Sequence, residues 1–184
     1  MIKNKQELIK YLETEKKLYV SPRLYGHLIQ LITCDPKLKV YRFIRYLRCE
    51  GYHHNQRGFI HKALRLYYWR KRNKLGLKLG LTIWDTSFEE GLYIYHPGNI
   101  VVNGSARIGK NCRLHGSNCI GNNGKTLDCP IIGNNVRLGV GAKVIGGVTI
   151  ADDVIIAAGA VVVHSVLEPG VTVAGVPARK ISHS

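Results

Sequence analysis

The chain has 184 residues, of which 45% are hydrophobic, so it is long enough for one or two small domains with a buried core. Its formal net charge is +15; residues 1–90 hold 19 Lys and Arg against 8 Asp and Glu, whereas residues 91–184 hold 8 against 4. This imbalance indicates an acidic partner, such as a phosphorylated substrate or an anionic membrane surface, or else a solvated basic helix face. The longest apolar run, residues 154–163, is about half of what a membrane span needs, which excludes an integral membrane protein.

Residues 1–80 are predicted to form helices. Asn4 is a candidate cap of the first, Ser21-Pro22 begins the second, and Asp35-Pro36 begins a third that Gly51 ends. Gly58 precedes a fourth helix, residues 59 to about 73. One side of this helix is largely basic, with Lys62, Arg65, Arg70, Lys71 and Arg72. Such a side suits contact with a membrane surface, although it more often covers its own domain.

From Val102 onward an aliphatic residue recurs at almost every sixth position. The series is Val102, Ile108, Leu114, Ile120, Ile132, Leu138, Val144, Ile150, Ile156 and Val162. A period of six is neither that of an α-helix nor that of an ordinary strand, and it is typical of a β-helix built from short parallel strands. Three such repeats make one coil, and the aliphatic residues of successive coils stack inside it. The fold class predicted is therefore α+β, with a helical domain at 1–80 and a β-helix domain at 81–184.

The six-residue phase breaks once, between Ile120 and Ile132. The intervening residues 122–130, Asn-Asn-Gly-Lys-Thr-Leu-Asp-Cys-Pro, are rich in turn-forming residues. An insertion in a solenoid usually projects as a loop, often from the binding face. We therefore expect one protruding loop here. The five cysteines form no CxxC pair, and Met-Ile-Lys-Asn-Lys at the start is not followed by the apolar segment of a signal peptide, so we expect a cytoplasmic protein with reduced thiols.

The second half of the chain resembles the hexapeptide-repeat acyltransferases, and within them the serine acetyltransferase-like branch. The resemblance rests on Tyr95-His-Pro-Gly-Asn-Ile-Val-Val102, on the repeats, and on Ala174-Gly-Val-Pro-Ala-Arg179. It implies a left-handed β-helix, which the six-residue period alone does not indicate. It also implies acetyl-CoA as the acetyl donor, an active site between subunits, and a homotrimer, with a dimer of trimers as the alternative. No metal is expected.

His96 is the candidate catalytic residue. It lies six residues before Val102, where the repeat would place an aliphatic side chain. An alcohol is a poor nucleophile at neutral pH, and an imidazole can accept its proton as the alcohol attacks a thioester. A backbone N–H would stabilise the resulting oxyanion. The resemblance implies direct attack in a ternary complex, so Cys129 is not expected to carry an acyl group.

The chain departs from the serine acetyltransferase pattern beside this histidine. Tyr95 stands where the family has an Asp, and a family Asp-Arg-His-Pro segment reads here Leu-Asp128-Cys129-Pro. The groups expected to hold serine are thus largely absent, which favours a neutral hydroxyl acceptor such as a sugar. His115, about one coil after His96, is a candidate for binding the acceptor or assisting proton transfer, with Tyr95 and Asp128 as further candidates; a surface position for His115 is the alternative.

The resemblance implies that acetyl-CoA binds to backbone groups at Ala158. The basic residues expected to contact its phosphates are His164, Arg179 and Lys180. The main prediction is an O-acetyltransferase that modifies a carbohydrate hydroxyl in surface polysaccharide biosynthesis, in the cytoplasm or peripherally at the inner membrane face. Three alternatives remain: a serine O-acetyltransferase of cysteine biosynthesis, an N-acetyltransferase for nucleotide sugars, and a non-enzymatic binding solenoid. The chain has no recognisable nucleic-acid-binding motif, so no nucleic acid partner is expected.

Overall fold

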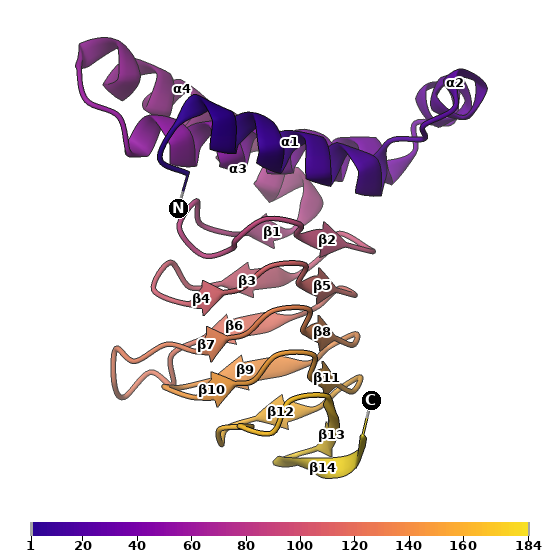
Figure 1. Ribbon diagram of the computed structural model, residues 1–184, viewed down its shortest axis with the longest axis vertical. Helices are drawn as coiled ribbons and strands as arrows, with labels where there is room; N and C mark the ends of the chain where they lie inside the picture. The colour runs from indigo at the N-terminus through magenta and orange to yellow at the C-terminus, as the bar shows by residue number, and fades with distance from the viewer. Residues whose placement is uncertain (1, 184) are drawn as a thin grey trace. The chain divides into compact units, whose positions relative to one another are not determined.

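The computed structural model describes residues 2–183 and divides after Leu79 into a helical unit and a repeat unit. The helical unit contains α1 (Lys5–Tyr19), α2 (Leu24–Ile32), α3 (Pro36–His54) and α4 (Phe59–Leu79) (Figure 1). None of these helices combines the length and the apolar character needed to cross a membrane.

Helices α1 and α3 begin at their predicted capping residues. Helix α2 begins at Leu24 rather than at Ser21-Pro22, and α4 continues to Leu79 rather than ending near residue 73. The Asn4 Oδ1 accepts a hydrogen bond from the Glu7 N–H at 2.8 Å, and Asp35 caps α3 with Pro36 in its first turn. The prediction that Gly51 ends α3 is wrong. Gly51 is buried inside the helix, which continues for three residues to His54. A glycine costs a helix only about 1 kcal/mol, and α3 packs along α4, so packing outweighs propensity here.

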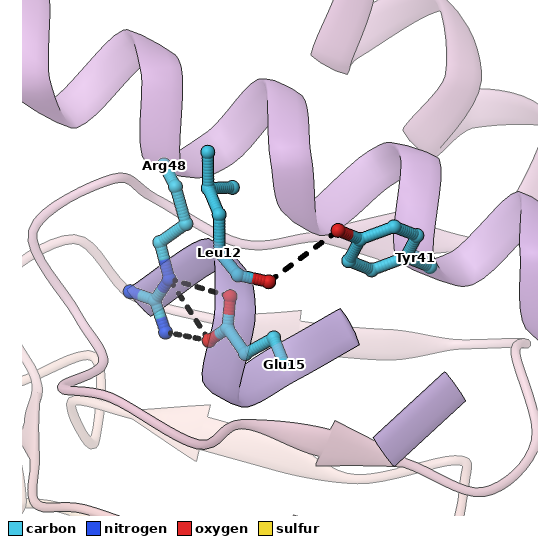
Figure 2. Close-up of polar contacts among 4 residues, drawn as sticks. All are labelled: Leu12, Glu15, Tyr41 and Arg48. Atoms are coloured by element: carbon cyan, nitrogen blue, oxygen red, sulfur yellow. Dashed lines mark hydrogen bonds and ion pairs between the residues drawn. The ribbon is translucent and has the colours of Figure 1, made fainter. Parts of the chain in front are cut away.

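A buried ion pair joins α1 to α3 in the helical unit. The Arg48 Nε and Nη2 groups donate to the Glu15 carboxylate at 3.0 and 2.6 Å, and both side chains are almost fully buried (Figure 2). The Tyr41 hydroxyl donates to the Leu12 carbonyl oxygen at 3.4 Å across the same two helices. Each charge is therefore desolvated and depends on the other for compensation.

A second buried ion pair shows that one residue of the predicted basic side of α4 was placed wrongly. Arg72 was expected to lie largely on that side, but it is buried, and its Nε lies 2.8 Å from the Glu50 Oε2 of α3. The arginine thus acts as a core residue of the helical unit. Arg70 and Lys71 are exposed, as expected for the basic side.

The repeat unit is a parallel β-helix with three faces, whose coils are stacked along its length (Figure 1). The first face contains β1 (Leu81–Thr82), β3 (Ile100–Val102), β6 (Cys119–Gly121), β9 (Lys143–Ile145) and β12 (Val161–Val162). The second contains β4 (Arg107–Ile108), β7 (Ile131–Ile132) and β10 (Thr149–Ile150). The third contains β2 (Tyr93–Ile94), β5 (Arg113–Leu114), β8 (Arg137–Leu138), β11 (Ile155–Ile156) and β13 (Val171–Gly175), with β14 (Ala178–His183) added antiparallel.

The predicted six-residue series forms the core of the repeat unit. All ten aliphatic residues of the series from Val102 to Val162 are at most 2% exposed. Parallel register places them above one another, as in Val102 beside Ile120 and Val144 beside Val162. Each buried aliphatic side chain contributes about 1.5–3 kcal/mol relative to exposure, so the stack stabilises the coils collectively.

Polar ladders fix one row of turns between the coils. Asn111, Asn135 and Asp153 all have left-handed backbone, with φ of 58°, 58° and 61°. Asn and Asp tolerate this conformation better than other non-glycine residues. The Asn111 side-chain amide donates to Asn135 at 3.0 Å, and that of Asn135 donates to Asp153 at 2.9 Å. The side-chain bonds add to backbone hydrogen bonds between the same turns, such as that from the Asn135 N–H to the Lys110 carbonyl oxygen at 2.7 Å.

The segment between β6 and β7, residues 122–130, projects beyond the coils as the predicted loop (Figure 1). The Asn123 Oδ1 accepts hydrogen bonds from the N–H groups of Lys125 and Thr126, both at 2.9 Å. This extra length makes the coil spacing 24 residues at this point, since Ile120 pairs with Val144 and Leu114 with Leu138.

Gly139 marks a close approach between two coils and supports a stability prediction. A Cβ atom at this position would lie 2.6 Å from the Ala158 backbone N and 2.9 Å from its Cα. Backbone cannot easily move aside, so Gly139→Ala is expected to lower the free energy of unfolding by about 1–3 kcal/mol. Urea denaturation followed by circular dichroism would measure this.

Gly121→Ala is the matched control for that prediction. A Cβ there would meet only the Asn103 Cβ, at the ordinary contact distance of 3.5 Å. Its unfolding free energy is expected to change by no more than about 0.5 kcal/mol. Equal effects of the two substitutions would contradict the role given to the close approach at Gly139.

Candidate functional site

His96 lies at the corner of the β-helix that follows β2. Its neighbour in the next coil is Gly116, because β2 and β5 pair with Ile94 beside Leu114. A Cβ on Gly116 would lie 3.3 Å from the His96 carbonyl oxygen and 3.7 Å from its Cβ. Gly116 has a φ of +116°, which favours glycine. The next coil therefore passes directly beside His96, and the His96 side chain is exposed rather than part of the core.

Tyr95 and His115 form an aromatic stack next to His96. Their ring centroids are 4.1 Å apart with an angle of 17° between the planes. Tyr93 packs edge-on against Tyr95 at 4.5 Å. Burial lowers the pKa of His115, and the nearby His96, Arg113 and Arg137 lower it further. The His115 imidazole is therefore neutral at a lower pH than an isolated histidine would be, and it retains both a donor and an acceptor nitrogen near neutral pH.

Asn118 orders the turn that faces His96, although it was not among the predicted site residues. Its side chain is buried, accepts from the Gly116 N–H at 3.0 Å, and donates to the Gly139 and Ala142 carbonyl oxygens at 2.8 and 3.2 Å. The Ser117 N–H also donates to the Gly98 carbonyl oxygen at 3.0 Å. The sequence does mark Asn118 as unusual, because this repeat position elsewhere holds Ala, Cys or Val.

Asp128 is not brought together with His96 by any contact in the described part of the chain. It is exposed on the loop, and its side chain lies against Gly147, where a glycine Cβ would be 2.8 Å from the Asp128 Cβ. This contact folds the loop back toward a later coil. Cys129, on the same loop, is a free thiol that is partly exposed.

The four residues predicted to hold acetyl-CoA lie in the later coils and the tail. Ala158 is exposed in a turn where the flanking Ala157 and Gly159 use their N–H groups for hydrogen bonds between coils, while among residues 2–183 the Ala158 N–H forms no such bond. His164 is exposed after β12. Arg179 donates to the Ala178 carbonyl oxygen, and Lys180 lies 2.7 Å from the Glu168 carboxylate.

These contacts leave the predicted residues unequally available for binding acetyl-CoA. The Lys180 charge is partly compensated by Glu168, although both side chains are about half exposed and such pairs are weak. The Ala158 turn has a small side chain and an available backbone donor, which suits an amide-containing chain such as pantetheine.

Within residues 2–183, no group of three or more His, Cys, Asp or Glu is arranged to hold a metal ion.

Comparison with known proteins finds similarity to a group of transferases. Residues 129–164 match the family model described as "Bacterial transferase hexapeptide (six repeats)". The chain is 36% identical over 97 residues to the serine acetyltransferase of Synechococcus elongatus, and 37% identical over 94 residues to that of Helicobacter pylori. These matches cover 52% and 50% of the chain and 39% and 54% of the relatives. The chain thus spans about two-fifths to half the length of the curated relatives it matches.

Solved structures agree on the fold. The serine acetyltransferase from Brucella abortus in complex with coenzyme A superimposes with a TM-score of 0.78 at 24% identity, covering 98% of this chain and 70% of that one. A serine acetyltransferase in complex with cysteine gives a TM-score of 0.75 at 25% identity, covering 97% and 71%. The predicted fold, N-terminal helices followed by a left-handed β-helix, is confirmed.

The prediction of a carbohydrate acceptor in surface polysaccharide biosynthesis is wrong. The relatives and the structures described above are serine acetyltransferases, which favours the serine alternative. The prediction treated the missing family groups around Tyr95 and Cys129 as evidence about the acceptor. Missing family residues show only that those particular contacts are absent, and they do not identify a different acceptor.

Proposed function

We propose that this chain transfers the acetyl group of acetyl-CoA to the hydroxyl of L-serine, with His96 as the general base. The observation that carries the proposal is the position of His96. It is exposed at a corner, beside the Tyr95–His115 stack, in a β-helix similar to those of serine acetyltransferases. A histidine placed for core packing would instead be buried with the aliphatic series.

The reaction follows from an imidazole at this place. The His96 imidazole takes the proton of the serine hydroxyl as its oxygen attacks the thioester carbonyl carbon. The carbonyl oxygen becomes an oxyanion, which a backbone N–H stabilises. When the carbon–sulfur bond breaks, the CoA thiolate leaves and receives the proton from the imidazolium. The products are O-acetylserine and CoA, and His96 returns to its neutral form.

The residues around His96 position the acceptor in this proposal. The neutral His115 ring is available as a hydrogen-bond donor or acceptor, and its stacking on Tyr95 fixes the plane of both rings. Asn118 holds the turn containing Gly116 at a fixed distance from His96. Such preorganisation matters because small displacements of reacting groups lower rates strongly.

Acetyl-CoA binding and assembly form part of the same proposal. The Ala158 turn would meet the pantetheine arm, and His164, Arg179 and Lys180 would meet the phosphates. A single face of a β-helix is open to solvent, so enclosing two substrates requires a neighbouring subunit. We therefore include a homotrimer in the proposal, with a dimer of trimers as the alternative, and a cytoplasmic location.

Release of CoA from acetyl-CoA by the purified full chain tests the function. A thiol-reactive dye would detect CoA, and mass spectrometry would identify O-acetylserine. We expect L-serine to stimulate release and L-alanine, which lacks the hydroxyl, not to do so. Release that is the same with both amino acids would exclude serine as the acceptor.

A further inference from the structure

Two arginines lie next to each other on the outer surface of the third face. Arg113 of β5 and Arg137 of β8 are direct neighbours in the parallel register. The residues on either side of each arginine are buried, so both side chains point outward. Neighbouring parallel strands are about 4.8 Å apart, so the two arginines leave the sheet side by side.

In the described part of the chain, no acidic side chain compensates these two charges. Among residues 2–183, neither Arg113 nor Arg137 forms an ion pair with Asp or Glu. Like charges directly opposite in a sheet destabilise it. An anion bound between the two guanidinium groups would remove this repulsion, and guanidinium groups pair with planar oxyanions through two parallel hydrogen bonds.

The arginine pair lies beside the candidate catalytic histidine. The Arg113 Nη1 donates to the Tyr95 hydroxyl oxygen at 3.4 Å, and Tyr95 stacks on His115. Both arginines are close enough to His115 to influence its ionisation, as is His96. The arginines, the tyrosine hydroxyl and the two histidines therefore belong to one corner of the repeat unit.

We propose that Arg113, Arg137 and the Tyr95 hydroxyl bind the carboxylate of the amino-acid acceptor. The proposal rests on the proposed function, because it assigns a site to one group of that substrate. Two oxyanions are available, the acceptor carboxylate and the phosphates of CoA. The carboxylate fits better, because only a short carbon chain separates it from the reacting hydroxyl near His96, whereas the pantetheine arm separates the phosphates from the thioester.

Kinetics of three variants test this assignment. Arg113→Gln and Arg137→Gln remove one charge each, and Lys143→Gln removes an exposed charge from β9 on a different face. Loss of a charge-assisted hydrogen bond is expected to raise the KM for L-serine by on the order of tenfold or more in each arginine variant. The KM for acetyl-CoA should stay at the wild-type value, and Lys143→Gln should change neither constant.

L-Serinamide, which lacks the negative charge, provides the matched substrate. Wild type should use it less efficiently than L-serine, and the arginine variants should lose most of this discrimination. A raised KM for acetyl-CoA with an unchanged KM for L-serine would overturn the proposal and assign the arginines to CoA phosphate. Unchanged constants in both arginine variants, with folding verified by thermal denaturation, would also overturn it.

Calorimetric titration of L-serine and L-serinamide into the CoA-saturated protein separates this proposal from the proposed function. Binding of L-serine that is lost in Arg137→Gln supports the carboxylate site even if no O-acetylserine forms, in which case only the proposed function fails. Turnover of L-serine with equal KM in wild type and both arginine variants leaves the function standing and overturns the site.

Discussion

Replacing His96 by alanine is expected to lower kcat/KM for acetyl transfer by a factor of roughly 10²–10⁴, the usual contribution of a general base. The serine hydroxyl would lose the group that removes its proton, while the surrounding coil would keep its structure. His96 is exposed, so its removal leaves no cavity in the core. The measurement is the rate of CoA release at several concentrations of L-serine, compared with wild type.

Two controls make the His96 result specific. Thermal denaturation of His96→Ala should match that of wild type, because the aliphatic core is untouched. His54→Ala removes another exposed histidine, at the end of α3 in the helical unit, and should retain activity. Activity of His96→Ala within about tenfold of wild type would be too small a loss for a general base and would place the catalytic group elsewhere.

Replacing Glu15 by alanine is expected to lower the free energy of unfolding of the helical unit by about 3–5 kcal/mol. The substitution leaves the Arg48 guanidinium buried, only 2% exposed, without the carboxylate that accepts its hydrogen bonds. A buried uncompensated charge costs far more than the loss of an exposed pair. Urea denaturation followed by circular dichroism at the helical band would measure the change.

The exposed pair of Lys180 and Glu168 is the matched control. Both side chains are about half exposed, so Glu168→Ala is expected to cost no more than about 1 kcal/mol. A double variant, Glu15→Leu with Arg48→Met, removes both buried charges and should recover much of the stability lost in Glu15→Ala. A Glu15→Ala variant as stable as wild type would show that water reaches Arg48 and solvates it.

The local patterns that predicted the fold act over a few residues. A six-residue period places its aliphatic residues inside whichever strands they occupy, so the core from Val102 to Val162 follows from spacing alone. Asn4 and Asp35 cap their helices through neighbouring N–H groups, which are also local. The loop at 122–130 was recognisable because turn-forming residues interrupt the period. His96 stood out because it occupies an aliphatic position in that period.

The contacts that the sequence did not reveal are those between residues of different coils. Tyr95 stacks on His115 across a spacing of 20 residues, and Arg113 adjoins Arg137 across 24, because the loop lengthens that coil. The coil length placed His115 near His96, but a regular spacing of 18 predicted neither the stacking of its ring on Tyr95 nor the pairing of the two arginines.

The wrong prediction of a carbohydrate acceptor also has a non-local reason. Family residues missing around Tyr95 were read as evidence against an amino-acid acceptor, whereas the neighbouring positions of the two arginines, which we propose bind its carboxylate, exist only in the folded β-helix. The burial of Arg72 against Glu50 has the same origin, since the partner belongs to another helix. The sequence by itself therefore determined the repeat, its core and the candidate base. The tertiary structure decided the charge pairs and the surroundings of that base, because electrostatic and stacking energies depend on distance in space.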